Sequence, residues 1–282
     1  MLPTHSLSLV IPHALLIGFF RFIQAGSRSG SKPPLSRRAI EDWLETELLR
    51  SSWEDSGKVY GYRKLHDDLL DQGETCCPNR VARLTRLAGI KAQIGYKRRP
   101  GSYSGKPSVA VDNTLDRQFD VEVPDKAWVT DITYIRTLEG FAYLAVVIDL
   151  YSRRVIGWAL QSRQATDVVL QALLSALWRR KPKQPVLVHS GSQFTSMDWA
   201  AFLKQHNLVH SMSRRGNCHD NAVVESFFNL LKRERIRRRV YRSREDARRD
   251  VFDYIEMFYN PKRKHARNGM LSPIDFERQQ KI

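Results

Sequence analysis

The stretch from Ala127 to Leu160 constrains the fold more than any other part of the chain, because it has the pattern of three consecutive β-strands. Residues 128–136 are rich in β-branched and aromatic side chains, and residues 141–149 are almost entirely apolar, as is typical of a strand covered on both faces. A short connection containing Gly140 separates them, and residues 154–160 form the third strand. The pattern predicts an antiparallel meander.

Asp131 does not fit this strand pattern. Aspartate is disfavoured in strands, and an unpaired carboxylate is costly to bury. One interpretation is a carboxylate that faces an edge or is satisfied by hydrogen bonds. The other is a metal ligand held on a rigid strand, and the local pattern leaves both open.

The chain after the meander alternates between helices and strands. Apolar periodicity predicts a helix, a strand, a helix and a strand, in that order, at residues 166–180, 186–189, 197–206 and 209–213. A long helix follows from residue 222 to 239, with Asp220 or Asn221 as its cap. This element order is that of a ribonuclease H-like α/β fold, a mixed sheet with flanking helices.

Residues 34–96 predict a separate helical domain of helix-turn-helix type. Ser36 is a candidate N-cap, and two short helices follow the first one, the last from Pro78 to Gly89. The apolar face expected for that last helix comprises Val81, Leu84, Leu87 and Ala88. The polar residues on or beside its other face are Asn79, Arg80, Arg83 and Arg86. Such a helix suits a reader of the DNA major groove, and an ordinary solvated basic face is the alternative.

The net charge of +16 indicates a polyanionic partner, nucleic acid before an anionic membrane. Residues 214–282 hold 18 Lys and Arg against 10 Asp and Glu, and Arg235 and Arg238 in this region are candidate phosphate contacts. We expect a poorly ordered leader at 1–33 and a basic linker at 97–123.

No segment approaches ~20 uncharged apolar residues, so we expect no membrane span. The three cysteines have neither a disulfide framework nor zinc-ligand spacing, which fits a reducing cytoplasm.

Glu225 lies one turn inside the long predicted helix, and Phe228 and Leu231 follow it at helical spacing. A carboxylate on the core-facing side of that helix can reach the edge of a central strand, so Asp131 and Glu225 form a candidate metal site. Hard oxygen ligands suit Mg²⁺ or Mn²⁺. Lys232, about two turns after Glu225 on the same face, can contact a phosphate.

Several motifs in order resemble a bacterial insertion-sequence transposase, more narrowly the second-frame product of a group related to retroviral integrases. They are WVTDITYIRT, YLAVVIDLYSRRVIGWAL, SRRGNCHDNAVVESFFNLLKRE and YNPKRKHARNGMLSPIDFE. The resemblance implies an integrase catalytic core with a basic helical extension at 124–282. It also implies DNA cleavage and strand transfer at transposon ends by a homo-multimer in the bacterial cytoplasm, with no small-molecule substrate. Its Asp-Asp-Glu metal triad would begin with Asp131 and end with Glu225, followed by Lys232.

The middle carboxylate of that triad is missing. In the family pattern, His-Ser at the end of the fourth strand is followed by Asp and one further residue, whereas His189-Ser190 here runs directly into Gly191. Other carboxylates that could stand in are Asp149, Asp198 and Asp220. Two functions stay open: a strand-transfer enzyme, and a DNA-binding, multimerising remnant without chemistry. The missing carboxylate favours the remnant, because the members of such a triad act as a unit.

Overall fold

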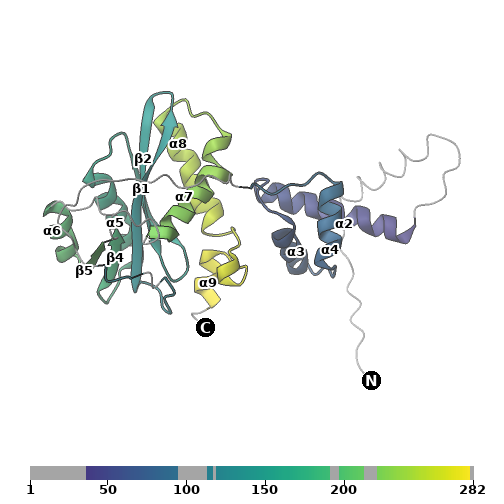
Figure 1. Cartoon of the computed structure of the whole chain (residues 1–282), viewed down its shortest axis with the longest axis horizontal. Helices are drawn as coiled ribbons and strands as arrows, with labels where there is room; N and C mark the ends of the chain where they lie inside the picture. Colours follow the sequence, from purple (N-terminus) through teal and green to yellow (C-terminus); the bar gives the residue numbers. More distant parts are fainter. Residues whose placement is uncertain (1–35, 95–112, 117–118, 191–196, 213–220, 280–282) are drawn as a thin grey trace, which may run out of the picture. The chain divides into compact units, whose positions relative to one another are not determined.

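The computed structural model describes residues 36–94, 113–116, 119–190, 197–212 and 221–279 (Figure 1). The predicted leader and most of the predicted linker lie outside these residues. The chain divides into two compact units with the boundary after Ala92. No helix in the described ranges is long and apolar enough to cross a membrane.

The N-terminal unit consists of α2 (Arg37–Asp55), α3 (Tyr62–Asp71) and α4 (Pro78–Leu87). The Ser36 hydroxyl accepts a hydrogen bond from the Ala39 amide, which confirms the predicted cap of the first helix. The buried apolar residues of the three helices are Leu49, Leu65, Leu69, Val81 and Leu84. The predicted apolar face of α4 is wrong at Leu87, which is 70% exposed. Here α4 ends, and its buried face follows Val81, Leu84 and Thr85.

Asp42 of α2 joins the first helix of this unit to the last. It accepts hydrogen bonds from Arg80 Nε at 3.0 Å and from Arg83 Nη2 at 2.6 Å. The bond from Arg83 lowers the pKa of Asp42, and Arg80 acts in the same direction. Two of the four side chains expected to read DNA therefore make ion pairs within their own unit, whereas Asn79 and Arg86 are exposed.

The C-terminal unit is built on a mixed sheet of five strands in the order β3-β2-β1-β4-β5. The strands are β1 (Ala127–Thr137), β2 (Gly140–Asp149), β3 (Val155–Gln161), β4 (Val186–Ser190) and β5 (Leu208–Met212). The first three pair antiparallel, and β4 and β5 add in parallel on the other side of β1. This topology confirms the predicted meander and the ribonuclease H-like fold.

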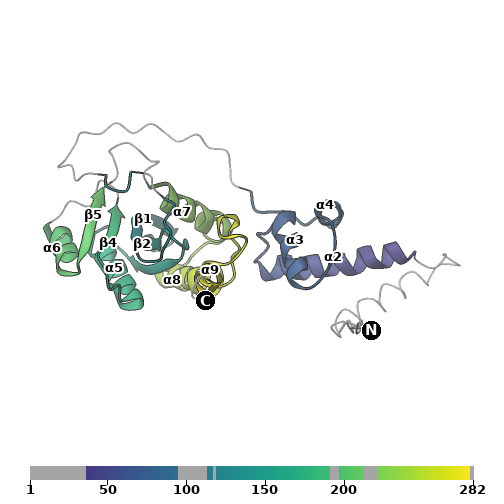
Figure 2. The ribbon, with the colours of Figure 1, turned by 90° about the horizontal axis from the view of Figure 1, so that it is seen from below.

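Helices cover both faces of this sheet (Figures 1 and 2). On one side lie α5 (Thr166–Arg180) and α6 (Met197–Gln205), and on the other lie α7 (Ala222–Glu234) and α8 (Arg244–Phe252). The buried cluster under α5 includes Trp128, Val147, Val169 and Val188. Gly157 of β3 lets α5 approach closely, because a Cβ there would stand 2.7 Å from the backbone nitrogen of Ala176.

The helix predicted to run from residue 222 to 239 is wrong at its C-terminal end. It stops at Glu234, and after Arg235 a 3₁₀ turn, η2 (Ile236–Arg238), follows. Arg235 has φ −130° and ψ −67°, outside the helical range. Repulsion between Lys and Arg at helical spacing opposes one continuous helix here. The attraction of Arg235 and Arg239 to Asp250 of α8, at 3.7 and 2.6 Å, favours the break.

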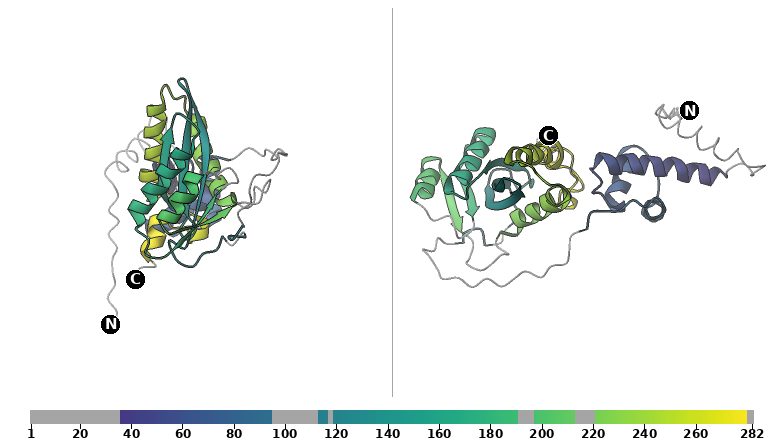
Figure 3. Two further views of the ribbon diagram at one scale, coloured as in Figure 1. Left: turned by 90° about the vertical axis from the view of Figure 1, so that its left-hand side faces the viewer. Right: turned by 90° about the horizontal axis from the view of Figure 1, so that it is seen from above.

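The last part of the chain packs back onto the core (Figure 3) through α8, the π-helical segment η3 (Asp253–Tyr259), η4 (Ala266–Asn268) and α9 (Pro273–Gln279). Glu234, the last residue of α7, is buried and accepts hydrogen bonds from Arg263 and from the Tyr254 hydroxyl. This buried cluster fixes the C-terminal end of α7 to the segment that follows α8.

Asp42→Asn should lower the free energy of unfolding of the N-terminal unit by about 1–2 kcal/mol at pH 7, because two guanidinium groups lose their anionic partner. The folded-state pKa is lowered, so this stabilisation is present above the pKa of an unfolded Asp, ~3.9, and is lost as the pH falls through the folded value. Hydrogen exchange of peptides from residues 36–94 measures it at pH 7, and thermal unfolding compares pH 7 with pH 2.5. Asp55→Asn, at an exposed position of the same helix, is the control. An equal loss at both pH values would contradict the ion-pair explanation.

Candidate active site on the central strand

Asp131 lies on the face of β1 that is turned toward α7. Trp128 belongs to the core under α5, so strand alternation places Val129, Asp131 and Thr133 on the opposite face. The carboxylate is half-buried, and its Oδ1 accepts the Ile132 amide at 2.8 Å. Burial raises the pKa of Asp131 to about 6, and the negative charge of Glu225 adds to the rise. The structure therefore brings Asp131 and Glu225 into electrostatic contact.

Glu225 stands in the first turn of α7 and is exposed. Lys232, two turns further along α7, is half-buried, with its Nζ 5.0 Å from the centre of the Tyr134 ring. Burial and the charge of Arg237 lower the pKa of Lys232, while the charge of Asp131 opposes this change. Asp131, Glu225 and Lys232 thus share one location, where α7 crosses β1.

Asn221 is a member of this site that the sequence analysis assigned only as a possible cap. It is the N-cap residue of α7, but its side chain makes no capping hydrogen bond. Instead its side chain lies near the Asp131 carboxylate and lowers the pKa of that group through hydrogen bonding. Its spacing could have found it, because residues four apart on a helix share a face and Asn221 precedes Glu225 by four.

The end of β4 lies beside Asp131. Strand register pairs Thr130 with Ser190 in parallel, and Ser190 is the last residue of β4. The Ser190 hydroxyl lies 3.0 Å from His210 Nε2, and His189 Nδ1 lies 2.9 Å from the Ser211 hydroxyl. Both side chains are therefore engaged with β5. Thr130, the partner of Ser190, directly precedes Asp131 in β1, so the end of β4 is level with the strand segment that carries this carboxylate. Residues 191–196 lie outside the described part of the chain.

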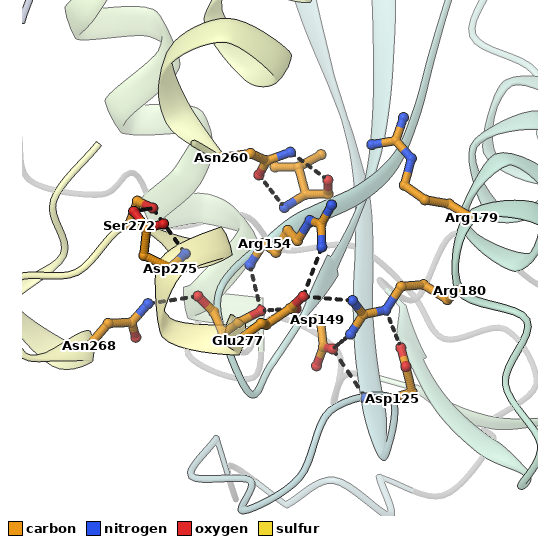
Figure 4. A network of polar contacts seen from close by, with 12 residues as sticks. Asp125, Asp149, Arg154, Arg179, Arg180, Asn260, Asn268, Ser272, Asp275 and Glu277 are labelled. Carbon is orange, nitrogen blue, oxygen red and sulfur yellow. Dashed lines mark hydrogen bonds and ion pairs between the residues drawn. The ribbon is translucent and has the colours of Figure 1, made fainter. Parts of the chain in front are cut away.

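Asp149 is bound into a separate structural network (Figure 4). It is fully buried and accepts Arg180 Nη2 at 2.7 Å as well as the amides of Asp125 and Tyr151. Arg180 also contacts Asp125 and Glu277, at 2.6 and 2.9 Å. Burial raises the pKa of Asp149 to about 6, and the two amides and Arg180 oppose the rise, so it is an anion at pH 7. Its carboxylate is saturated by these partners.

The other two candidate substitutes are not at the site either, as far as the structure describes them. Asp198 is exposed in the first turn of α6, on the side of the sheet away from α7. Asp220 lies outside the described residues.

The donor atoms at this site fit a hard divalent cation by type. Asp131 and Glu225 offer carboxylate oxygens, and Asn221 offers a buried amide oxygen with no hydrogen-bond partner in the described structure. Among the described residues, no group of three or more His, Cys, Asp and Glu side chains could hold a metal ion. The site thus has the oxygen chemistry that Mg²⁺ or Mn²⁺ requires, with two carboxylates.

The remaining candidate phosphate contacts lie just beyond α7. Arg235 is half-buried and 3.7 Å from Asp250. Arg238 is exposed, and its Nη1 donates to the Glu234 carbonyl at 3.2 Å. Together with the exposed Arg237, these side chains form a basic segment one turn after Lys232.

Asp131→Asn should raise the free energy of unfolding by roughly 1–2 kcal/mol at pH 8, because it removes a charge that burial disfavours. The folded-state pKa is above the unfolded value of ~3.9, so the cost is small near pH 4, where the folded carboxyl is protonated and only about half of the unfolded one is ionised, and it grows as the pH rises toward 6. Urea unfolding in the presence of a chelator measures both conditions, with the exposed Asp198→Asn as control. If Asp131→Asn changed stability equally at pH 4 and pH 8, burial of the charge would not be the cause.

Comparison with known proteins is consistent with this architecture. Residues 122–218 and 225–280 match models of the integrase core domain, and residues 40–99 match an HTH-like domain. The transposase InsF of insertion sequence IS3A from Escherichia coli K12 is 46% identical over 82% of this chain and 81% of its own length. The transposase of element IS904 from Lactococcus lactis is 35% identical over 86% of this chain and 97% of its own.

Among solved structures, the HTLV-2 integrase catalytic core in complex with magnesium covers 55% of this chain and 97% of its own, at 14% identity and a TM-score of 0.43. The sequence identity over most of both chains, together with the integrase core and the HTH-like domain, is decisive: this chain belongs to the family of bacterial insertion-sequence transposases with an integrase core.

Proposed function

We propose that the chain binds DNA as a transposase but is impaired in cleaving and joining it, because its active site has two of the three carboxylates. The observation that carries this proposal is the register of β4. The last residue of β4, Ser190, pairs with Thr130, the neighbour of Asp131, and the sequence continues with Gly191 where the family pattern has an aspartate. A glycine has no donor atom for a cation.

The residues at the site have separable roles in this proposal. Asp131 and Glu225 would hold Mg²⁺ or Mn²⁺, and an ion bound there supplies positive charge next to a phosphate undergoing in-line displacement. Lys232 would donate to a DNA phosphate near the scissile bond. With its pKa raised to about 6, Asp131 is an anion at neutral pH and can act as a ligand.

His189 and Ser190 do not replace the missing carboxylate. Both engage partners on β5, and a neutral imidazole or hydroxyl brings no charge to offset that of a hard cation. With one carboxylate fewer, the cation is bound more weakly and the developing phosphorane charge is less well neutralised. The sheet itself needs no residue at that position, so folding survives the loss.

Inserting Asp-Arg between Ser190 and Gly191 should restore Mg²⁺-dependent cleavage and joining of DNA that carries transposon ends. The gain should be at least about 10³-fold, the usual scale for one member of a catalytic unit. The assay is gel analysis of cleaved and joined products with the purified full chain. Restoration of the third carboxylate in register with Asp131 is the physical reason.

An Asn-Arg insertion is the matched control, because it restores chain length without the charge. It should leave the chain as inactive as the unmodified protein. Robust activity of the unmodified chain, abolished by Asp198→Ala, would instead show that another carboxylate has taken the role.

DNA affinity should rest on the helical unit and on the basic segment after α7. Arg86 is the cleaner probe of sequence reading, since removing Arg83 would also disrupt the ion pair with Asp42. Arg86→Ala should weaken binding to transposon-end duplex by about 1–3 kcal/mol more than binding to random duplex. Arg238→Ala should weaken both about equally and reduce the salt slope by about 1. Fluorescence anisotropy over a range of salt concentrations measures both effects, and affinity independent of salt would contradict phosphate contact.

A remnant that binds DNA ends as a homo-multimer without chemistry is the second candidate function. The same two-carboxylate site favours it. The two candidates separate in the insertion experiment: a remnant stays inactive with either insertion while its DNA binding is retained.

A further inference from the structure

Asn221 is the least explained polar residue of the site. It is only 6% exposed, and it occupies the N-cap of α7. An asparagine at this position normally uses Oδ1 to accept an amide hydrogen bond from the first turn of its helix. That bond is absent here, and Oδ1 is buried without a hydrogen-bond partner in the described structure. Buried oxygens left in this state are few in native proteins, and a bound ion or water is one explanation for them.

The nitrogen of the same amide shows how the Asn221 side chain is oriented. The Asp131 carboxylate can only accept, so the bond between the two side chains must be donated by Asn221 Nδ2. Oδ1 belongs to the same amide group, so it also lies near the Asp131 carboxylate.

The chemistry of Oδ1 decides what it can bind. An amide oxygen is an acceptor only, so its ligand is a cation or a group with an O–H or N–H bond. A DNA phosphate diester is excluded, because it carries no proton at neutral pH. The negative charges of Asp131 and Glu225 beside the amide favour a cation, and a hard divalent ion takes carboxylate and amide oxygens together.

We propose that Asn221 is a third oxygen ligand of the cation held by Asp131 and Glu225, either directly or through one of the ion's water molecules. This inference rests on the metal site of the proposed function. Asn221 then has two tasks: Nδ2 orients the Asp131 carboxylate, and Oδ1 shares the ion. As a neutral ligand it adds no charge, so it supports binding without replacing the missing carboxylate.

The test is Mn²⁺ binding to the full chain, measured by electron paramagnetic resonance of free Mn²⁺ and by calorimetry without DNA. Asn221→Ala should weaken Mn²⁺ affinity by about 10-fold or more, the scale of losses around metal sites. Asn221→Asp keeps a good N-cap residue and brings a third carboxylate, so it should tighten binding by about 10-fold or more. Asn229→Ala and Asn229→Asp, at an exposed position of the same helix, should leave the affinity unchanged.

Each outcome decides the matter. If Asn221→Asp binds Mn²⁺ no more tightly than the unmodified chain, Asn221 is at most a support for Asp131, whatever Asn221→Ala does, and the proposal is overturned. If Asp131→Ala also leaves Mn²⁺ binding unchanged, the metal site of the proposed function has failed instead. Should binding to the unmodified chain be too weak to measure, detectable binding to Asn221→Asp but not to Asn229→Asp supports the proposal, and no binding to either overturns it.

Discussion

The pairing of β1 with β2 on one edge and with β4 on the other is the constraint on which the rest of the core depends. Antiparallel register sets Asp131 opposite Val146, and parallel register brings the end of β4 level with Thr130. A slip of one residue in either register would turn Asp131 into the core under α5. The sheet therefore fixes which face carries the carboxylate, and α7 supplies Glu225, Asn221 and Lys232 above that face.

Two buried ion-pair networks hold helices that pack on this sheet. Arg180 at the end of α5 joins Asp125, Asp149 and Glu277, and so fixes α9 to the sheet (Figure 4). Glu234 at the end of α7 binds Arg263 and Tyr254. Networks of this kind are costly to break at one partner, because a buried charge is left behind. The Glu234 network fixes the C-terminal end of α7, and the first turn of the same helix carries Glu225.

Two buried aspartates with similarly raised pKa values have different surroundings. Asp131 and Asp149 are both buried enough to raise their pKa values to about 6. Asp149 is saturated by a guanidinium and two amides, whereas Asp131 faces a second carboxylate and an asparagine whose oxygen has no described partner. A cation is stabilised most where two carboxylates lie close together, because its charge offsets their mutual repulsion. The arginines of the N-terminal unit differ in a similar way. Arg80 and Arg83 are bound to Asp42, whereas Arg86 is exposed.

The sequence by itself determined the meander, the strand and helix order, the cap at Ser36 and the family, because these follow from local periodicity, capping chemistry and motif order. It also predicted Asp131, Glu225 and Lys232 as site residues, since a carboxylate within a strand pattern and the spacing of residues along a helix can both be read from the sequence. It could not show that α7 ends at Glu234, since Asp250, which favours that break, lies on another helix. Nor could it show that the Asp149 carboxylate is bound by Arg180, or that the Asn221 side chain lies near Asp131 instead of capping α7. Those outcomes depend on residues far apart in the chain, which only the tertiary structure brings within hydrogen-bonding distance.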